Sequence, residues 1–350
     1  MYKPKLSHAV VTAFLEKWSG GSVRNLEYVD FGFVSTIYSF ETYSKESGRS
    51  EKLIAKFSAH ENAGGQEKNQ FVHELTKGSN LTVAEIREVG EVELPVSNPT
   101  PYNTENFSSD SYPLTYSFIR WIDGEHFPDL QFKPAAPWVP IAIETVEQIS
   151  DIDISSTSGW GWFGPEGIGK FKSWQEHLLN SCFDKSKSRL YAQHRDRFED
   201  GFLELETHEY FSGKLRDLVE KLPDVRRCLV HTDFGWDNVL VNDGAVEAVI
   251  DWDNAVFGDE LYDLVRIGVY APAIDLKSVV RERWEVENRD LEHFDLRWDA
   301  CAVHMIVDVL DWYGWSENPA SYAWMKARGL ELLGEGPPVT EPVPGSSYVL

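Results

Sequence analysis

The feature that most constrains the fold of this 350-residue chain is the stretch Leu229–Asp263. It contains two short runs of high β-sheet propensity, Val239–Val241 and Ala245–Ile250, and Asn242–Gly244 between them has the composition of a tight hairpin turn. We therefore predict a loop, a strand, a turn and a second strand that ends at Asp251. Because a hairpin folds back on itself, residues before its first strand and after its second are expected to lie close together.

Polar side chains with a regular spacing flank this hairpin. His231, Asp233 and Asn238 precede it in the order His-x-Asp-x-x-x-x-Asn, and Asp251 follows it. In enzymes that transfer a phosphoryl group from ATP, this spacing sets a base beside the acceptor hydroxyl, and the Asn and a later Asp hold magnesium. We predict Asp233 as the base, Asn238 and Asp251 as Mg²⁺ ligands, and His231 as a brace of the loop. The alternative, ordinary loop and cap residues, leaves the joint spacing unexplained.

A lysine in an apolar strand is the second expected part of the site. Lys56 lies in Leu53–Phe57, which has the apolar-apolar-Ala-Lys order of the kinase strand whose lysine holds the α- and β-phosphates of ATP. A lysine buried in such a strand needs a negatively charged partner, because burial of an unpaired ammonium is costly. We expect this partner to be Glu67, at the start of a helix predicted over Glu67–Lys77, with Glu74 as the alternative.

Two other segments are expected to contact the nucleotide. Gly32, Ser35 and Thr36 lie between two predicted strands, where a kinase places the loop that covers the phosphates. A single glycine is a poor match to a glycine-rich loop, so a plain hairpin is the alternative. Ser117 and Ile119 lie near the end of a later predicted strand, at the position of a kinase hinge, where backbone groups would pair with adenine. A plain edge strand is the alternative there.

These segments together resemble the aminoglycoside phosphotransferases, a family of small-molecule kinases. The resemblance includes Thr157–Trp174, Pro223–Phe234 and Ala248–Tyr262, and extends over most of residues 20–275. It implies an α+β, protein-kinase-like fold of two lobes. An N-lobe at 1–119 would hold an antiparallel sheet with a helix, and a mostly helical C-lobe at 120–334 would carry the catalytic loop. Residues 335–350, rich in proline and glycine, are predicted to form a flexible tail.

The resemblance also implies an activity and a substrate site. The implied enzyme is an ATP- and Mg²⁺-dependent phosphotransferase that modifies a hydroxyl of an aminoglycoside or aminocyclitol antibiotic, such as hygromycin B. Asp153 and Tyr270 match substrate-site positions of the family, although Asp153 has helix or turn capping as its alternative. Asp237, beside Asn238, stands where a relative has an asparagine and is also expected at the substrate site.

Three acids follow Asp251 along the chain. On an extended chain, Asp253 would face the same side as Asp251 and share its metal, but a related enzyme has a serine there. Asp259 and Asp263 are expected to be caps and loop anchors rather than ligands.

Two other functions remain open at the level of the sequence. The same fold and motif suit a metabolic kinase that acts on choline, homoserine or a fructosamine. The second alternative is a non-catalytic, kinase-like binding protein, which the intact set of Lys56, Asp233, Asn238 and Asp251 disfavours.

The composition limits which binding partners and which cellular compartment can be expected. With 33 basic and 57 acidic side chains the net charge is −24, which repels nucleic acid and anionic membranes and attracts a polycation; a contribution to solubility alone would also explain it. No apolar run approaches the ~18 residues of a membrane span, and the first residues lack the hydrophobic core of a secretory signal. The three cysteines form no disulfide or zinc pattern. We expect a cytoplasmic monomer with a small cationic substrate.

Overall fold

The chain folds into two compact units in a computed structural model, which describes residues 3–30, 34–44, 48–59, 63–97, 111–131 and 137–344. The N-terminal unit comprises residues 1–125, 164–166 and 240–253, and the C-terminal unit comprises the remainder. The first boundary therefore lies after residue 125 instead of residue 119. In addition, most of the hairpin that follows the predicted catalytic loop groups with the N-terminal unit and not with the C-lobe.

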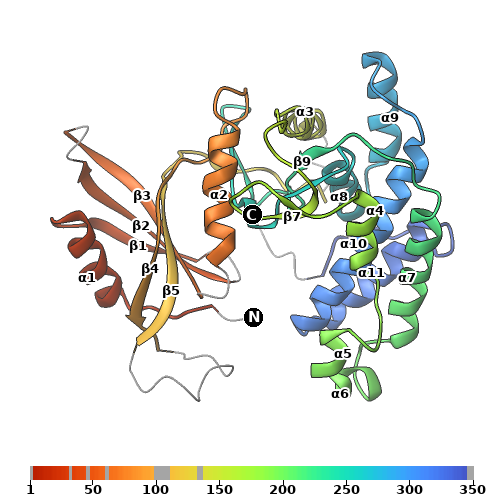
Figure 1. Cartoon of the computed structure of the whole chain (residues 1–350), viewed down its shortest axis with the longest axis horizontal. Helices are drawn as coiled ribbons and strands as arrows, with labels where there is room; N and C mark the ends of the chain where they lie inside the picture. The colour runs from red at the N-terminus through yellow and green to blue at the C-terminus, as the bar shows by residue number, and fades with distance from the viewer. Residues whose placement is uncertain are drawn as a thin grey trace. The chain divides into compact units, whose positions relative to one another are not determined.

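The N-terminal unit is built around a five-stranded antiparallel sheet (Figure 1) with the strand order β1-β2-β3-β5-β4. Its elements are α1 (His8–Ser19), β1 (Arg24–Val29), β2 (Ser35–Ser44), β3 (Arg49–Ala59), α2 (Ala63–Leu75), β4 (Ile86–Pro95) and β5 (Ser111–Arg120), followed much later in the chain by the hairpin of β10 (Val239–Asn242) and β11 (Ala245–Val249). The turn of this hairpin has positive φ at Asp243 (47°) and Gly244 (82°), as a type I′ turn requires. The predicted sheet, helix and hairpin are confirmed.

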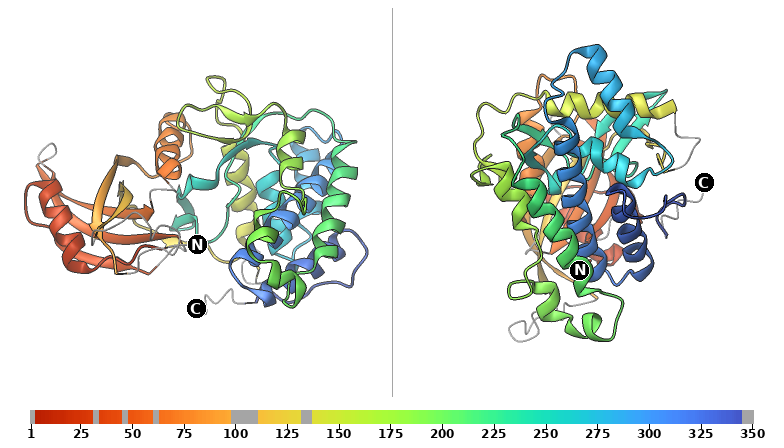
Figure 2. Two further views of the ribbon diagram at one scale, coloured as in Figure 1. Left: turned by 60° about the horizontal axis from the view of Figure 1, so that its bottom comes forward. Right: turned by 90° about the vertical axis from the view of Figure 1, so that its right-hand side faces the viewer.

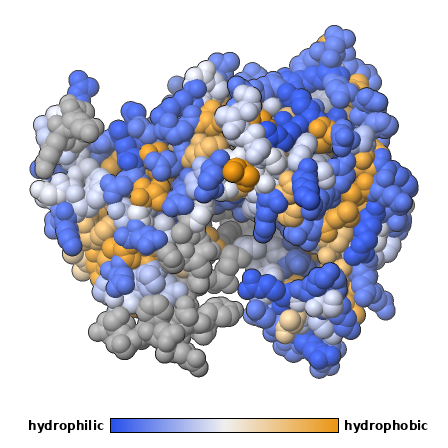
Figure 3. All heavy atoms as spheres, viewed as in Figure 1, coloured by the Kyte–Doolittle hydropathy of each residue, from blue (hydrophilic) through white to orange (hydrophobic). Residues whose placement is uncertain are grey.

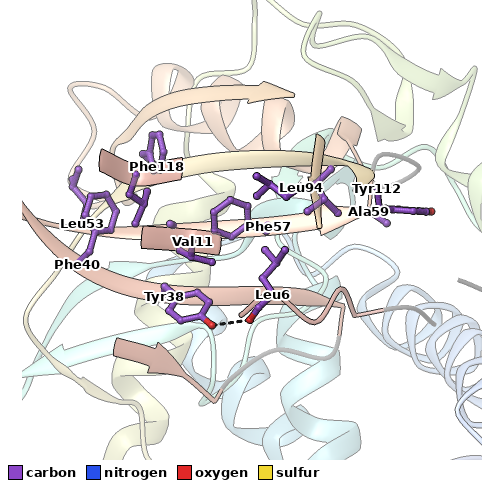
Figure 4. Close-up of a cluster of buried hydrophobic side chains, with 13 residues drawn as sticks. Leu6, Val11, Tyr38, Phe40, Leu53, Phe57, Ala59, Leu94, Tyr112 and Phe118 are labelled. Carbon is purple, nitrogen blue, oxygen red and sulfur yellow. Dashed lines mark hydrogen bonds between the residues drawn. The ribbon is translucent and has the colours of Figure 1, made fainter. Parts of the chain in front are cut away.

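One face of the five-stranded sheet packs against α1. Alternate residues of β3 and the apolar face of α1 contribute to this core: Leu53, Ala55, Phe57, Val11 and Leu15. Figure 4 shows the cluster, in which the hydroxyl of Tyr38 donates to the carbonyl of Leu6 at 2.9 Å. Because side chains alternate along a strand, this packing directs Lys56 to the opposite face.

Helix α2 covers that opposite face, as the views in Figures 1 and 2 show. The amide of Gln66 on α2 donates to the hydroxyl of Ser58 at 3.0 Å and to the carbonyl of Thr115 at 3.2 Å. Both acceptors are buried, so these bonds satisfy polar groups that the helix would otherwise leave unpaired. The helix is thereby fixed beside the strand that carries Lys56.

The C-terminal unit is mostly helical, as predicted. Its elements, starting at the border of the unit, are β6 (Glu125–His126), α3 (Val139–Ser150), β7 (Trp160–Phe163), β8 (Gly169–Phe171), α4 (Trp174–Asn180), α5 (Arg189–Gln193), α6 (Arg195–Glu199), α7 (Leu205–Val219), β9 (Cys228–Val230), β12 (Val256–Gly258), α8 (Tyr262–Tyr270), α9 (Leu276–Glu287), α10 (Phe294–Trp315) and α11 (Pro319–Leu332). The short 3-10 helix η3 (Trp252–Asn254) follows β11, and its first two residues belong to the N-terminal unit. Four short strands form a sheet in the order β8-β7-β12-β9. The long helix α10 is buried along most of its length and packs against α7, α8 and α11.

Residues 335–344 pack against the C-terminal unit, whereas the sequence predicted a flexible tail. The indole of Trp324 on α11 donates to the carbonyl of Glu341 at 2.8 Å, and the backbone N–H of Val343 donates to Oε1 of Gln131 at 2.9 Å. The side chain of Val343 is buried. The prolines of this segment have no backbone N–H to donate, but side chains elsewhere in the unit form hydrogen bonds with other backbone N–H and C=O groups of the segment. Residues 345–350 lie outside the described ranges.

The face drawn in Figure 3 is mainly hydrophilic, and hydrophobic side chains appear on it in small groups. Among the helices that the structure describes, none combines the length and the apolar character needed to cross a bilayer. All three cysteines are free thiols.

Candidate active site

The loop between β9 and β10 carries the predicted His-x-Asp-x-x-x-x-Asn residues and is anchored by α8. Asp263, in the first turn of α8, accepts hydrogen bonds from the backbone N–H groups of His231 and Thr232, each at 2.8 Å. Thr232 adopts a left-handed conformation (φ 63°) that turns both N–H groups toward this carboxylate. Burial raises the pKa of Asp263, and His231 and the two N–H groups oppose the rise. The predicted role of Asp263 as a loop anchor is confirmed.

His231 lies inside the loop and has no exposed surface. Its Nδ1 accepts a hydrogen bond from the backbone N–H of Asp233 at 3.2 Å. A histidine in this position fixes the backbone conformation of the loop without needing to reach a substrate. This arrangement supports the bracing role predicted for it.

Both carboxylate oxygens of Asp233 are bound by other side chains. Nη2 of Arg266 donates to Oδ1 at 2.5 Å, and Nδ2 of Asn238 donates to Oδ2 at 3.2 Å. The same amide nitrogen of Asn238 also donates to the backbone carbonyl of Asp233 at 2.9 Å. Because its nitrogen is engaged with Asp233, Asn238 offers its amide oxygen to a cation. Asn238 itself is almost completely buried.

Arg266 is a site residue that the sequence prediction missed. It follows Asp263 by three residues, so both side chains lie on the same face of α8, toward the loop. The available signal was a single arginine within the otherwise apolar run Leu264–Val269, where a buried charge needs a partner.

A pocket in the C-terminal unit lies beside this loop and contains two of the three predicted substrate residues. Asp237, Arg266 and Tyr270 line it, together with Phe127 and Trp236. The guanidinium carbon of Arg266 lies 4.9 Å from the ring centroid of Tyr270, a cation–π distance. The pocket therefore presents an aromatic face with charges of both signs.

Asp153, the third predicted substrate residue, does not line this pocket. It is exposed, and its Oδ1 accepts the backbone N–H of Ser155 at 2.9 Å. Hydrogen bonds from Ser155 lower the pKa of Asp153 below its ordinary value. Turn capping, the alternative role for Asp153, is what the structure shows.

Asp308 on α10, which interacts electrostatically with Arg266, is a second residue that the sequence prediction missed. Its side chain is exposed, although neighbouring parts of the protein displace some of the water around it. This desolvation raises the pKa of Asp308 to about 6, the charge of Asp311 adds to the rise, and Arg266 opposes it. The carboxylate is thus coupled electrostatically to the arginine that lines the pocket. Its position within an apolar helix gave no signal that distinguished it from an ordinary surface acid.

Lys56, in the N-terminal unit, is buried and paired with two carboxylates. Its Nζ lies 2.9 Å from Oδ1 of Asp251 and 3.1 Å from Oδ2 of Asp253. Burial alone lowers the pKa of Lys56, but the two carboxylates outweigh it and the pKa is raised. Glu67, the predicted partner, is instead exposed on α2, and Glu74, the alternative, pairs with Lys77, two residues beyond the end of the helix. The need for a partner was predicted correctly, but not its identity.

Asp253 also joins α2 to the turn that follows β11. The amide of Asn69 donates to Oδ1 of Asp253, and Nζ of Lys68 donates to its backbone carbonyl at 3.0 Å. A Cβ on Gly65 would lie 2.8 Å from Cγ of Asp253, so only glycine allows this approach. Burial raises the pKa of Asp253, and Lys56 opposes the rise. Asp253 therefore has the role of partner to Lys56 that the sequence predicted for Glu67 on α2.

The predicted phosphate-binding hydroxyls are engaged inside the sheet. Ser35 and Thr36 belong to β2 and are 2% and 3% exposed. The hydroxyl of Ser35 lies 2.8 Å from that of Ser58, and the hydroxyl of Thr36 donates to the carbonyl of Pro4. Neither hydroxyl is available to a phosphate, so the prediction is wrong for the side chains, and a phosphate contact through the backbone amides of these residues stays a prediction. Gly32 lies outside the described residues.

The predicted hinge residues lie too early in the chain. Ser117 and Ile119 belong to β5, which pairs with β3 on one side and β4 on the other. In a central strand the backbone groups are used by both neighbours, so they cannot pair with adenine. Strand β5 ends at Arg120, but the backbone N–H of Trp121 still donates to the carbonyl of Lys52 on β3 at 3.1 Å, so residues 122–124 are the first to leave the sheet.

Asn238 in the C-terminal unit carries an amide oxygen and Asp251 in the N-terminal unit carries a carboxylate, and each is a type of ligand that magnesium accepts. Within the described ranges, no group of three or more His, Cys, Asp or Glu side chains is arranged to hold a metal. Magnesium that accompanies a nucleotide needs only one or two protein oxygens, because phosphates and water complete its shell. An amide oxygen and a carboxylate are donors of the required kind.

Comparison with known proteins agrees with this arrangement. Residues 34–300 match the sequence pattern described as the phosphotransferase enzyme family. The chain is 30% identical over 284 residues to hygromycin-B 4-O-kinase of Escherichia coli. The aligned region covers 78% of this chain and 70% of the relative.

Solved structures with a similar fold include kinases that are named for different substrates. A thermostable mutant of aminoglycoside phosphotransferase APH(4)-Ia, in a ternary complex with AMP-PNP and hygromycin B, superposes with a TM-score of 0.69 and 25% identity, over 94% of this chain and 99% of that one. A putative fructosamine-3-kinase from Thermobifida fusca has a TM-score of 0.54 and 14% identity over 93% and 100%, and shows the fold alone. The two-lobed fold expected from the sequence is confirmed, and the chain belongs to the phosphotransferase enzyme family.

Proposed function

We propose that this protein transfers the γ-phosphoryl group of ATP to a hydroxyl of an aminocyclitol antibiotic of the hygromycin B class. The observation that carries the proposal is Asp233, held through both carboxylate oxygens on an anchored loop beside a pocket. The identity to hygromycin-B 4-O-kinase and the complexes of APH(4)-Ia with AMP-PNP and hygromycin B support this choice of donor and acceptor.

In this mechanism the loop supplies the base and its orientation. Asp233 would accept or orient the proton of the acceptor hydroxyl while His231 and Asp263 keep the loop in place. Phosphoryl transfer passes through a loose transition state, so catalysis depends mainly on position and charge. A carboxylate with two fixed hydrogen-bond donors meets this demand better than one free to rotate.

The N-terminal unit would hold the nucleotide. Lys56 would bind the ATP phosphates, and Asp251 would supply a metal ligand, as would Asn238 from the loop. Magnesium, when bound, neutralises the charge that develops on the phosphates. The two carboxylates that now bind Lys56 hold its ammonium on the face of β3 that α2 covers, so the lysine is fixed before a ligand arrives.

Acids near the pocket support a cationic acceptor. Asp237 lines the pocket and Asp308 interacts electrostatically with its arginine. The net charge of −24 would attract an amino sugar over longer distances. Tyr270 contributes an aromatic ring to the pocket wall, where it packs against Arg266 and Trp324. We also propose a monomer that acts in the cytoplasm, where ATP is available.

The proposal is tested by ADP release with Mg-ATP against hygromycin B, other aminoglycosides, choline, homoserine and a fructosamine. We expect turnover on hygromycin B, and a loss of about 10²- to 10⁴-fold in kcat for Asp233→Asn, the range associated with general-base catalysis. Asp153→Asn, which removes an exposed acid outside the pocket, should behave as the wild type. Activity only on a metabolic alcohol would reject the antibiotic as acceptor. Failure to bind Mg-ATP would reject catalysis altogether.

A further inference from the structure

Helix α8 contacts the catalytic loop at two independent points. Asp263 binds the backbone of residues 231–232, and one turn later Arg266 binds the side chain of Asp233. The first contact fixes where the loop runs. The second fixes the rotation of one carboxylate, since Oδ1 is bound by Arg266 and Oδ2 by Asn238.

Arg266 is itself held in place by its surroundings. Its side chain is 21% exposed, and the guanidinium lies over the ring of Tyr270. That ring in turn stacks on Trp324 of α11, with centroids 6.2 Å apart and planes inclined by 15°. A guanidinium backed by two aromatic side chains has few alternative rotamers, so its hydrogen bond to Asp233 is directed.

We propose that Arg266 is a positioning residue for phosphoryl transfer. It holds the carboxylate of Asp233 in the orientation that the acceptor hydroxyl requires, and contributes to kcat through Asp233 without binding ATP. The inference rests on the proposed role of Asp233 as the base. A misplacement of about 1 Å in a reacting group costs about 10²-fold, so loss of this contact is expected to lower kcat by about 10²-fold.

A positioning role is distinguished from a merely structural one by chemical rescue. Arg266→Ala leaves a space of the size of a guanidinium ion between Asp233 and Tyr270. We expect kcat on the accepted substrate to fall about 10²-fold, the KM for ATP to stay unchanged, and millimolar guanidinium chloride to restore part of kcat. Arg266→Lys keeps the charge but loses the planar fork, and should be intermediate. The kcat of Arg266→Lys also tests the proposal if the alanine variant is poorly folded.

Arg197 offers a matched control. Its side chain is 16% exposed, and it pairs with Glu317 at 2.5 Å and with the carbonyl of Gly314 at 2.7 Å, away from the pocket. Arg197→Ala should lower the melting temperature but leave kcat near the wild-type value, with no response to guanidinium.

The outcomes separate this inference from the proposed function. If Asp233→Asn is inactive but Arg266→Ala retains wild-type kcat, only the positioning role is wrong. A loss in Arg266→Ala that guanidinium does not restore and Arg266→Lys does not reduce would also overturn it. If Asp233→Asn keeps wild-type turnover, the base assignment fails and the role of Arg266 fails with it.

Discussion

Acidification between pH 7.5 and 5 should destabilise the C-terminal unit through His177. This side chain is 3% exposed, stacks on Trp174 with ring centroids 4.9 Å apart, and its Nδ1 has no hydrogen-bond partner in the described part of the chain. Burial lowers the pKa of His177 to about 4. The folded state therefore keeps the imidazole neutral under conditions in which the unfolded chain protonates it.

The sign and size of the effect follow from this difference in pKa. An unfolded histidine has a pKa near 6.5, so the unfolded chain binds a proton first as the pH falls, and stability is lost from about pH 6.5 downward. With a folded pKa of about 4, the loss from this one group is about 2 kcal/mol at pH 5 and reaches ~3 kcal/mol near pH 4. His304, whose ring lies 5.4 Å away, also has a lowered pKa because of burial and adds to the slope.

The assay is urea unfolding at a series of pH values between 7.5 and 5, in the wild type and in His177→Phe. The variant retains an aromatic ring of similar shape but cannot bind a proton. Its stability should depend less on pH, by about 2 kcal/mol over this range, whatever its absolute stability. Equal slopes in the wild type and His177→Phe would show that His177 is accessible to protons in the folded state and refute the reasoning.

Two further perturbations test other parts of the structure. Gly65→Ala should destabilise the protein by about 1–3 kcal/mol and raise the KM for ATP, because the new methyl group would press on Asp253. Gly64 has open space around it, so Gly64→Ala should instead stabilise α2 by up to about 1 kcal/mol. Urea unfolding and ATP titration check both, and equal effects of the two substitutions would contradict the contact. A chain that ends at Gly336 should show a raised KM for the acceptor and an unchanged KM for ATP, because Gln131 in the pocket wall loses the hydrogen bond from the N–H of Val343. A chain that ends at Pro344 serves as the control and should match the full-length protein. Identical acceptor KM values in both truncations would show that residues 337–344 have no role at the pocket.

Local sequence patterns predicted the parts of the site that depend on local structure. The turn at Asp243 and Gly244 determines the hairpin, and the alternation of β3 determines the face on which Lys56 lies. Such features need only neighbouring residues, so one sequence is sufficient to predict them. The anchoring role of Asp263 was likewise predictable from its place after the hairpin.

The missed features depend on pairings over long distances in the sequence. Asp253 is separated from Lys56 by 197 residues, and no local pattern distinguishes it from Glu67 as the partner. The last paired residue of β5 depends on where β3 and β4 end, so the hinge was placed too early. The proline-rich end resembled a linker because its hydrogen-bond partners, among them Trp324, lie elsewhere in the chain.

The discontinuity of the N-terminal unit has a consequence for its folding during synthesis. Lys56 is translated long before Asp251 and Asp253, because residues 240–253 of the unit are made only after about half of the C-terminal unit. At about 5–20 residues per second, the ribosome needs on the order of 10–40 s to cover that interval. Until then the ammonium of Lys56 lacks its two counter-charges, and α2 lacks the turn to which Asn69 and Gly65 dock. A fragment that stops at residue 125 would keep these defects permanently.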